Sequence, residues 1–434
     1  MEVMPLRSAI KGHFATIFKR GGYARDAAIN TFGVAIAAAV PLITLPVIAR
    51  LYSPADFGVF GVFSSFVGLS AVVATGRYEA AIILPEEKLG ALETAFAASM
   101  FSLGVSIIFL IGLLLALVMQ ISFLQEHYWL GLIAIFTMVA AATVQILLNC
   151  AIRERMFSWM SLARGAGACI TAISTVALGV MKFEIWGLVL GLIAGYLTTI
   201  VILSWMILKV YLPDIVYVTF SGIRIHAMRY RQFPFFSLPS DFANTLATNL
   251  PVLFFSTFFG SVSAGYLTMF QRIWAGSGIL IQGLGETFRE RAASELKLLG
   301  NFRRVYRITL IPLASVAAVL LVALVSSGPM LFAIVMGEQW RESGEYGRIL
   351  ALLVCTQFVA SPLSWSFYIA ERLKLMMVWQ WSLLAIFFLI LWVGSHRFNE
   401  TTTLALLAGV GTAMYLVYLF ASFWISGGKG IRAQ

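Results

Sequence analysis

The chain has 434 residues, of which 60% are hydrophobic and only 12% charged, and its mean hydropathy is +0.90. Soluble domains carry about twice that charged fraction, so the composition excludes a soluble globular protein and indicates an integral membrane protein of many helices. The net charge of +10 is scattered through short loops, which is typical of membrane topology and argues against nucleic-acid binding.

The first 22 residues place apolar side chains at helical spacing with lysines and arginines between them. This pattern predicts a helix lying on the membrane surface, within an amphipathic segment covering residues 1–25. A disordered basic tail is the alternative interpretation.

Twelve apolar segments follow, separated by turn signals such as Ser53-Pro54 and Gly328-Pro329. We expect membrane-spanning helices at about 26–50, 57–84, 89–119, 128–152, 159–181, 184–208, 237–260, 264–288, 306–327, 345–370, 375–394 and 402–425. Lysine and arginine concentrate in alternate loops, which predicts that both termini are cytoplasmic.

An internal repeat divides these segments into two halves. The turn Tyr52–Gly58 matches Phe259–Gly265, and the same register lays Gly76-x-x-Glu79 over Gly283-x-x-Glu286. In addition, Glu154-Arg155 recurs as Glu371-Arg372. Transporters often place a substrate site between such repeats.

The predicted fold is therefore an all-α integral membrane protein with about twelve transmembrane helices in two pseudo-symmetric six-helix bundles around a central cavity. The expected parts are a cytoplasmic segment 1–25, a first bundle 26–208, a cytoplasmic linker 209–236, a second bundle 237–426 and a cytoplasmic tail 427–434.

Arg272 lies well inside an apolar run. Centring an arginine in hydrocarbon costs about 2.5–3.5 kcal/mol on insertion scales. The positions three and four residues away hold no acidic residue, so the compensating partner is expected outside its own helix: a neighbouring helix, a wet cavity or a bound anion.

Other polar residues also fall within predicted spans. Asp241, Asn244, Thr245 and Thr248 follow helical spacing and form one polar stripe. The stripe can line a wet cavity, or it can serve hydrogen bonding between helices.

Arg77 is either a second cavity cation or a side chain that snorkels to the interface. It lies two positions from Glu79, so on a helix the two are not expected to pair.

The sequence contains no GxxxxGK[ST] motif and no His/Cys cluster with metal spacing. The longest predicted non-cytoplasmic loop, 329–346, is expected to be a solvated loop or a short surface helix rather than a catalytic domain. These features predict a protein that is not an enzyme.

Four phrases resemble the polysaccharide flippase family, the O-antigen and capsule translocases of the multidrug/oligosaccharidyl-lipid/polysaccharide exporter superfamily. They are ARLYSPADFGVFG (49–61), GRYEAAIILPEE (76–87), FGSVSAGYLTMFQR (259–272) and QWRESGEYGRILALL (339–353). The resemblance implies two helix bundles around a cationic cavity. It also implies transfer of undecaprenyl-diphosphate-linked oligosaccharide across the bacterial inner membrane, from the cytoplasmic to the periplasmic leaflet, for O-antigen, capsule or exopolysaccharide assembly.

Related lipid II flippases carry a cavity arginine in span eight, and the matching residue is Arg272. The hypothesis is that Arg272, with Arg77, holds the diphosphate, which suits the planar fork of arginine. Gln271, Trp274 and the stripe of Asp241, Asn244, Thr245 and Thr248 are expected to contact sugars.

Glu79 and Glu286 are candidates for proton or sodium coupling, with no other cofactor expected. The expected partners are the lipid-linked oligosaccharide, membrane lipid and other polysaccharide assembly proteins. The alternatives are a multidrug or cation antiporter of the same superfamily and a membrane glycan polymerase or ligase.

Overall fold

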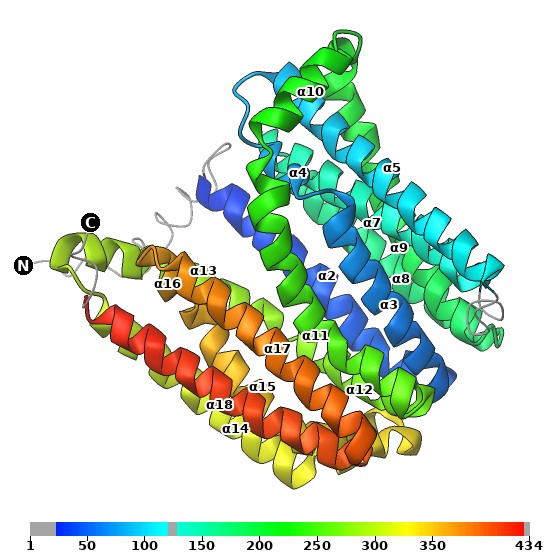
Figure 1. Ribbon diagram of the computed structural model, residues 1–434, viewed down its shortest axis with the longest axis vertical. Coiled ribbons are helices and arrows are strands. Elements are labelled where there is room, and N and C mark those ends of the chain that lie inside the picture. Colours follow the sequence, from blue (N-terminus) through cyan, green and yellow to red (C-terminus); the bar gives the residue numbers. More distant parts are fainter. Residues whose placement is uncertain (1–22, 120–127, 429–434) are drawn as a thin grey trace, which may run out of the picture. The chain divides into compact units, whose positions relative to one another are not determined.

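The computed structural model describes residues 23–119 and 128–428, which form helices and turns with no strand (Figure 1). The predicted all-α class is confirmed. The predicted surface helix in residues 1–22 and the end of the tail, 429–434, lie outside the described residues.

Every predicted apolar segment contains helix. Among the described residues, nine helical segments are long and apolar enough to cross a membrane. They comprise α3 (Pro54–Ala74), α5 (Lys88–Val118), α7 (Tyr128–Arg153), α8 (Phe157–Val180), α9 (Ile185–Ile215), α14 (Arg303–Met336), η2 with α15 and α16 (Glu338–Trp340, Arg341–Leu363, Trp365–Ile369), α17 (Leu373–Arg397) and α18 (Glu400–Ser426). The other three predicted spans correspond to α2 (Tyr23–Leu51), α11 (Leu238–Phe258) and the pair α12 (Ser261–Ala275) and α13 (Gly278–Leu299).

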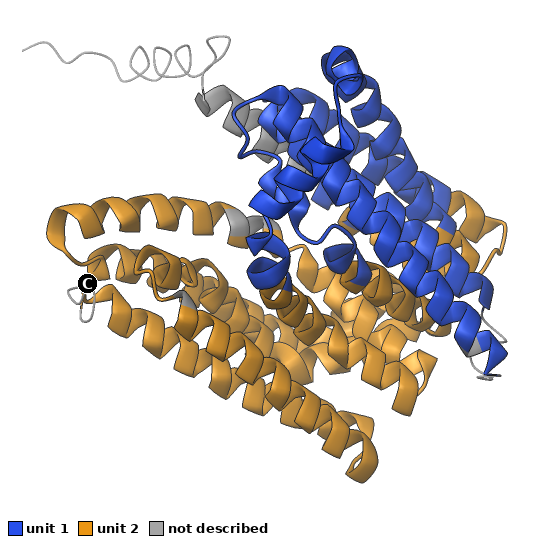
Figure 2. Cartoon of the chain, turned by 45° about the horizontal axis from the view of Figure 1, so that its top comes forward, with its two compact units in different colours: residues 1–41, 70–175, 190–238 blue, residues 42–69, 176–189, 239–434 orange. Residues whose placement is uncertain are grey.

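The chain divides into two compact units (Figure 2). Unit 1 comprises residues 1–41, 70–175 and 190–238, and unit 2 comprises 42–69, 176–189 and 239–434. The units are interleaved in sequence, and the last passage between them, after residue 238, adjoins the predicted linker 209–236. The boundaries of two contiguous six-helix bundles stay a prediction.

In unit 1, small residues let helices α8 and α9 approach closely. A methyl group added at Gly191 would lie 2.1 Å from the Thr175 hydroxyl, and one at Gly195 would lie 1.9 Å from the Thr171 hydroxyl. Helices in lipid associate through such small-residue contacts because lipid tails leave little hydrophobic driving force between them.

In unit 2, the start of α3 is fixed by its own sequence. Ser53 and Asp56 form a reciprocal cap, in which the Ser53 backbone N–H donates to the Asp56 carboxylate at 2.9 Å and the Asp56 N–H donates to the Ser53 hydroxyl at 3.2 Å. Pro54 occupies the first helical position, where its missing N–H costs nothing.

The matched turns of the repeat meet where α3 and α12 pack together. An ideal Cβ on Gly58 would lie 1.7 Å from the Ser261 carbonyl oxygen, and one on Gly265 would lie 1.8 Å from the Pro54 carbonyl oxygen. Each glycine therefore faces the first residue of the other helix. This reciprocal contact supports the alignment of Tyr52–Gly58 with Phe259–Gly265.

The match of Glu154-Arg155 with Glu371-Arg372 is shifted by one residue. Arg155 and Glu371 are the left-handed residues, with φ of 54° and 56°. The next residues, Met156 and Arg372, each donate their backbone N–H at 2.8 Å to the carbonyl five positions earlier. Both helices thus end in the same Schellman turn, and Arg155 corresponds to Glu371 rather than to Arg372.

Two alternatives were expected for 329–346, a solvated loop and a short surface helix, and the solvated loop is wrong. Helix α14 continues to Met336, and only Gly337 separates it from the short helix η2 (Glu338–Trp340). Trp340 is fully buried and donates its indole N–H to the Ala49 carbonyl at 2.7 Å. Gln339 donates to the same carbonyl at 2.6 Å. The indole of Trp340 and the side-chain amide of Gln339 therefore fix this turn inside unit 2.

Candidate functional site

Arg272 lies in the last turn of α12, eleven residues after Ser261, where the helix begins. At 1.5 Å per residue this is about 17 Å along the axis, or roughly half of a 30 Å hydrocarbon layer. The predicted single helix over 264–288 is wrong, because the chain breaks at Gly276-Ser277 before α13 starts at Gly278. The arginine is therefore next to a helix interruption.

The guanidinium of Arg272 forms cation–π contacts with two aromatic rings of α3. Its Cζ lies 4.5 Å from the centroid of Phe60 and 5.4 Å from that of Phe57. Among the side chains that the structure describes, none forms an ion pair or hydrogen bond with the Arg272 side chain. A cation–π contact is worth about 0.5–2 kcal/mol, so the rings offset only part of the cost of a charge at this depth.

The two rings are held rigidly. Phe57 and Phe60 are 0% and 2% exposed, whereas Arg272 is half-buried. The Trp340 and Phe57 rings pack in a T-shaped arrangement with 5.0 Å between centroids. The aromatic support of the guanidinium is thus built into the core.

Gly276 and Ser277 form the interruption after Arg272. Gly276 has ordinary helical angles, but a methyl group there would lie 2.5 Å from a methyl carbon of Leu42 in α2. The Leu42 side chain would have to rotate to admit a larger residue at position 276. Because Arg272 lies in the last turn of α12, its positive charge also interacts favourably with the carbonyl end of the helix.

The predicted polar stripe lies on α11, away from that helix's buried face. Asn244 and Thr248 are exposed and Asp241 and Thr245 half-buried, whereas Ala243 and its neighbours on the opposite face are buried. The Thr248 hydroxyl donates at 2.9 Å to the Thr245 carbonyl of its own helix. The stripe therefore presents polar atoms on the side of α11 that is not packed in the core.

The remaining predicted residues of unit 2 differ in their surroundings. Gln271 and Trp274 are half-buried. The Trp274 ring packs against Phe270 and Phe358, with centroids 6.5 and 6.4 Å away, so part of its surface belongs to the hydrophobic core. Glu286 is exposed on α13.

In unit 1, Arg77 and Glu79 form an ion pair with 3.0 Å between Nη1 and Oε1. The expectation that they would not pair is wrong, because Arg77 is not helical: its φ of 61° is left-handed, and it precedes the short helix α4 (Tyr78–Ala81). The Arg77 side chain is 34% exposed and that of Glu79 only 5%. Of the two candidate arginines, Arg77 has a carboxylate beside it.

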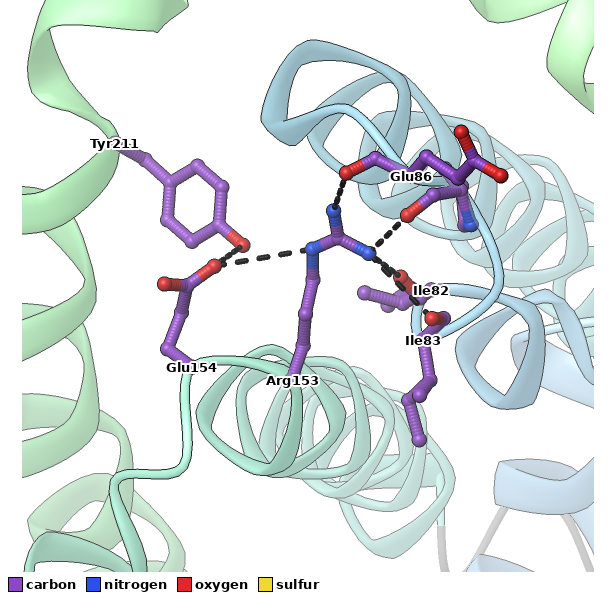
Figure 3. A network of polar contacts seen from close by, with 7 residues as sticks. Ile82, Ile83, Glu86, Arg153, Glu154 and Tyr211 are labelled. Atoms are coloured by element: carbon purple, nitrogen blue, oxygen red, sulfur yellow. Dashed lines mark hydrogen bonds and ion pairs between the residues drawn. The ribbon is translucent and has the colours of Figure 1, made fainter. Parts of the chain in front are cut away.

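A second network, not expected from sequence, holds the turn after α4 (Figure 3). Arg153 donates to the carbonyls of Ile83 and Glu86 at 3.4 and 3.1 Å, and also to those of Ile82 and Pro85. A partner glutamate, Glu154, lies 3.8 Å from the Arg153 Nε and accepts a 2.8 Å hydrogen bond from the Tyr211 hydroxyl. Arg153 thus donates hydrogen bonds to backbone carbonyls that have no partner at the end of a short helix, so this network is structural.

The fold is that of membrane transporters. The structure resembles the lipid II flippase MurJ in an inward closed conformation, with a TM-score of 0.67 and 14% identity over 92% of this chain and 90% of the other. It also resembles an inward-facing multidrug resistance MATE family transporter of the MOP superfamily, with a TM-score of 0.60 and 13% identity. That match covers 91% of this chain and 96% of the other. For the eukaryotic MATE transporter AtDTX14 the TM-score is 0.56 and the identity is 17%, and the match covers 94% of this chain and 97% of the other. The chain is thus a multi-pass membrane protein with a transporter fold rather than an enzyme fold.

The family follows from the sequence itself. The model of the polysaccharide biosynthesis protein family, Polysacc_synt_3, matches residues 47–345, which is more than half of the chain. The protein therefore belongs to this family. No curated protein matches the chain.

Proposed function

We propose that the protein is a flippase that moves undecaprenyl-diphosphate-linked oligosaccharide from the cytoplasmic to the periplasmic leaflet of a bacterial inner membrane. The observation that carries the proposal is Arg272: a half-buried cation about 17 Å along a membrane helix, set on two buried rings, with no carboxylate partner among the described residues. Membership of the polysaccharide biosynthesis protein family supports a glycan substrate.

The chemistry of the substrate fits this cation. A diphosphate brings about two negative charges into a low-dielectric region, where each needs a fixed positive partner. Arginine stays protonated and can donate two parallel hydrogen bonds to one phosphate. The rings of Phe57 and Phe60 contact the guanidinium through their π faces, so they take up none of its capacity to donate conventional N–H hydrogen bonds to a phosphate.

The other predicted residues take secondary roles in the proposal. Asn244 and Thr248 are exposed, and with Asp241, Thr245, Gln271 and Trp274 they would contact sugars. Arg77, which is paired with Glu79, would add positive charge only when that pair opens. Glu79 and Glu286 stay candidates for proton or sodium coupling.

The test is a set of Arg272 variants in a strain whose surface glycan depends on this protein. Arg272→Ala should reduce surface glycan at least about tenfold, because loss of one charge-assisted contact is worth about 1.5–3 kcal/mol. Arg272→Lys keeps the positive charge but loses the planar guanidinium that can donate two parallel hydrogen bonds, so partial activity is expected. Arg341→Ala removes an exposed arginine that pairs only with Glu338 among the described residues, and it serves as the matched control.

Two further measurements separate the proposal from its rivals. Native mass spectrometry of the purified protein should show weaker retention of undecaprenyl diphosphate in Arg272→Ala, with unchanged retention of undecaprenol. A multidrug antiporter would instead change drug susceptibility when the gene is removed. Normal surface glycan in both Arg272 variants, at normal protein levels, would remove this residue from the mechanism.

A further inference from the structure

Helix α10 (Phe220–Arg229) is a separate short helix between the long helices α9 and α11. The Thr219 hydroxyl caps its start by accepting the Gly222 N–H at 3.0 Å. One face of α10 docks on the beginning of α5, where the buried Glu93 carboxylate lies 3.1 Å from Nδ1 of His226. Gly222 packs against the same carboxylate, since a methyl group there would lie 1.7 Å from Glu93 Oε1.

The docking position sets the level of α10 in the membrane. Glu93 lies five residues after α5 begins at Lys88, so α10 packs on the first two turns of a membrane-spanning helix (Figure 1). It also follows α9, whose 31 residues extend about 46 Å and exceed a hydrocarbon layer of about 30 Å. Both neighbours place α10 at the boundary between hydrocarbon and water.

The other face of α10 is exposed and largely apolar. Phe220, Ile225 and Met228 are 71%, 60% and 58% exposed. Phe220 and Met228 lie on the half of the helix opposite Gly222 and His226, and Ile225 lies at its side. The following π-helix η1 (Phe233–Ser237) continues this surface with two more exposed rings.

Positive charge accompanies these apolar side chains. Residues 216–237 contain Arg224, Arg229 and Arg231 and no aspartate or glutamate. No ion pair joins any of the three to a carboxylate within the described ranges. Arg231 lines a hollow of about 450 Å³ together with Gln232, Phe235 and Phe236.

We propose that the exposed face of α10 and η1 is a binding surface for anionic phospholipid. Apolar side chains interleaved with arginines are what a helix lying in the interface requires: the apolar groups enter the acyl boundary and the arginines reach lipid phosphates. In the hollow, Arg231 contacts a phosphate while Phe235 and Phe236 cover the upper acyl chain. The docked face, fixed through Glu93 and His226, keeps the segment from leaving the membrane surface.

The test places a spin label on the exposed face of the full-length protein in lipid nanodiscs. Met228→Cys is labelled in a Cys169→Ala background, because Cys169 is the exposed cysteine among the described residues. Collision with oxygen, which concentrates in lipid, is compared with collision with a nickel chelate, which stays in water. A label at Glu338→Cys, a position with a 73% exposed side chain in a tight turn, is the water-facing reference.

In nanodiscs that contain phosphatidylglycerol, the label at position 228 should favour oxygen, whereas the reference label should favour nickel. Each juxtamembrane arginine contributes about 1 kcal/mol of attraction to an anionic surface, equivalent to about fivefold. The phosphatidylglycerol content needed for this effect should therefore rise about fivefold for each of Arg224→Gln, Arg229→Gln and Arg231→Gln.

Two results would overturn the proposal. A label that favours nickel in every lipid composition would show that the surface faces water. A label shielded from both oxygen and nickel would show that protein, either a second copy or another partner, covers the surface. Elution of each variant as a single species in size-exclusion chromatography checks that the fold is intact.

Discussion

Replacing Gly58 with alanine tests the contact between the two repeated motifs. The added methyl group would lie 1.7 Å from the Ser261 carbonyl oxygen, whereas ordinary contact begins at 3.4 Å, so the two helices would have to separate by about 1.7 Å. The neighbouring atom is backbone and cannot rotate away. A gap of this size forfeits more than half of the dispersion energy of the atoms that lose contact.

The magnitude follows from two opposing terms. Overpacking costs about 1–3 kcal/mol, and contact with rigid backbone favours the upper end. Alanine recovers up to about 1 kcal/mol because it is a better helix former than glycine. Gly58→Ala should therefore destabilise unit 2 by about 2 kcal/mol.

A control for helix propensity lies ten residues along the same helix. A methyl group at Gly68 meets no atom within 4 Å, so Gly68→Ala should be neutral or stabilising by up to about 1 kcal/mol. Thermal unfolding of the detergent-solubilised protein, followed by size-exclusion chromatography, should separate the two variants clearly. Gly265→Ala should resemble Gly58→Ala, since its methyl group would lie 1.8 Å from the Pro54 carbonyl oxygen.

The double variant adds a sharper test. Once the helices have separated for one methyl group, the second needs little extra space, so the combined destabilisation should be less than the sum. Equal stability of Gly58→Ala and Gly68→Ala would refute the reasoning, because it would mean that the close approach of α3 and α12 does not occur in the folded protein.

Two further predictions concern single positions. Trp340→Phe keeps most of the ring but removes one of the two side-chain donors to the Ala49 carbonyl, which should cost about 0.5–1.5 kcal/mol in thermal unfolding, and wild-type stability of this variant would contradict the hydrogen-bond argument. Trp340→Ala also removes the buried ring and should cost about 3–5 kcal/mol. Arg155→Gly and Glu371→Gly should each stabilise the protein by up to about 1 kcal/mol, because both residues have left-handed backbone angles that glycine adopts without strain. Destabilisation by either glycine would show that the side chain has a role which outweighs the backbone strain.

Sequence reasoning succeeded where the determining physics is local. Each apolar segment is helical because lipid leaves no other way to satisfy its backbone hydrogen bonds, and hydrophobicity is readable residue by residue. Arg272 could be selected for the same reason, because a charge in an apolar run is costly wherever its partner lies.

Sequence reasoning failed where a backbone break changed the geometry. Arg77 and Glu79 were assumed to lie on one helix, which would direct them apart, but the left-handed angle at Arg77 brings them together. The helix predicted to contain Arg272 is interrupted at Gly276-Ser277, where Gly276 lies close to Leu42, more than two hundred residues earlier in the chain. Neither break follows from residue composition alone.

The sequence by itself determined that this protein is a helical membrane protein of the polysaccharide biosynthesis family with a costly arginine in its eighth apolar segment. Only the tertiary structure decided what supports that arginine. Phe57 and Phe60 come within reach of Arg272 because Gly58 and Gly265 let α3 and α12 pack backbone to backbone. Hydrophobicity is a property of each segment by itself. The partner of a side chain depends instead on which helices carry residues small enough to let them pack closely.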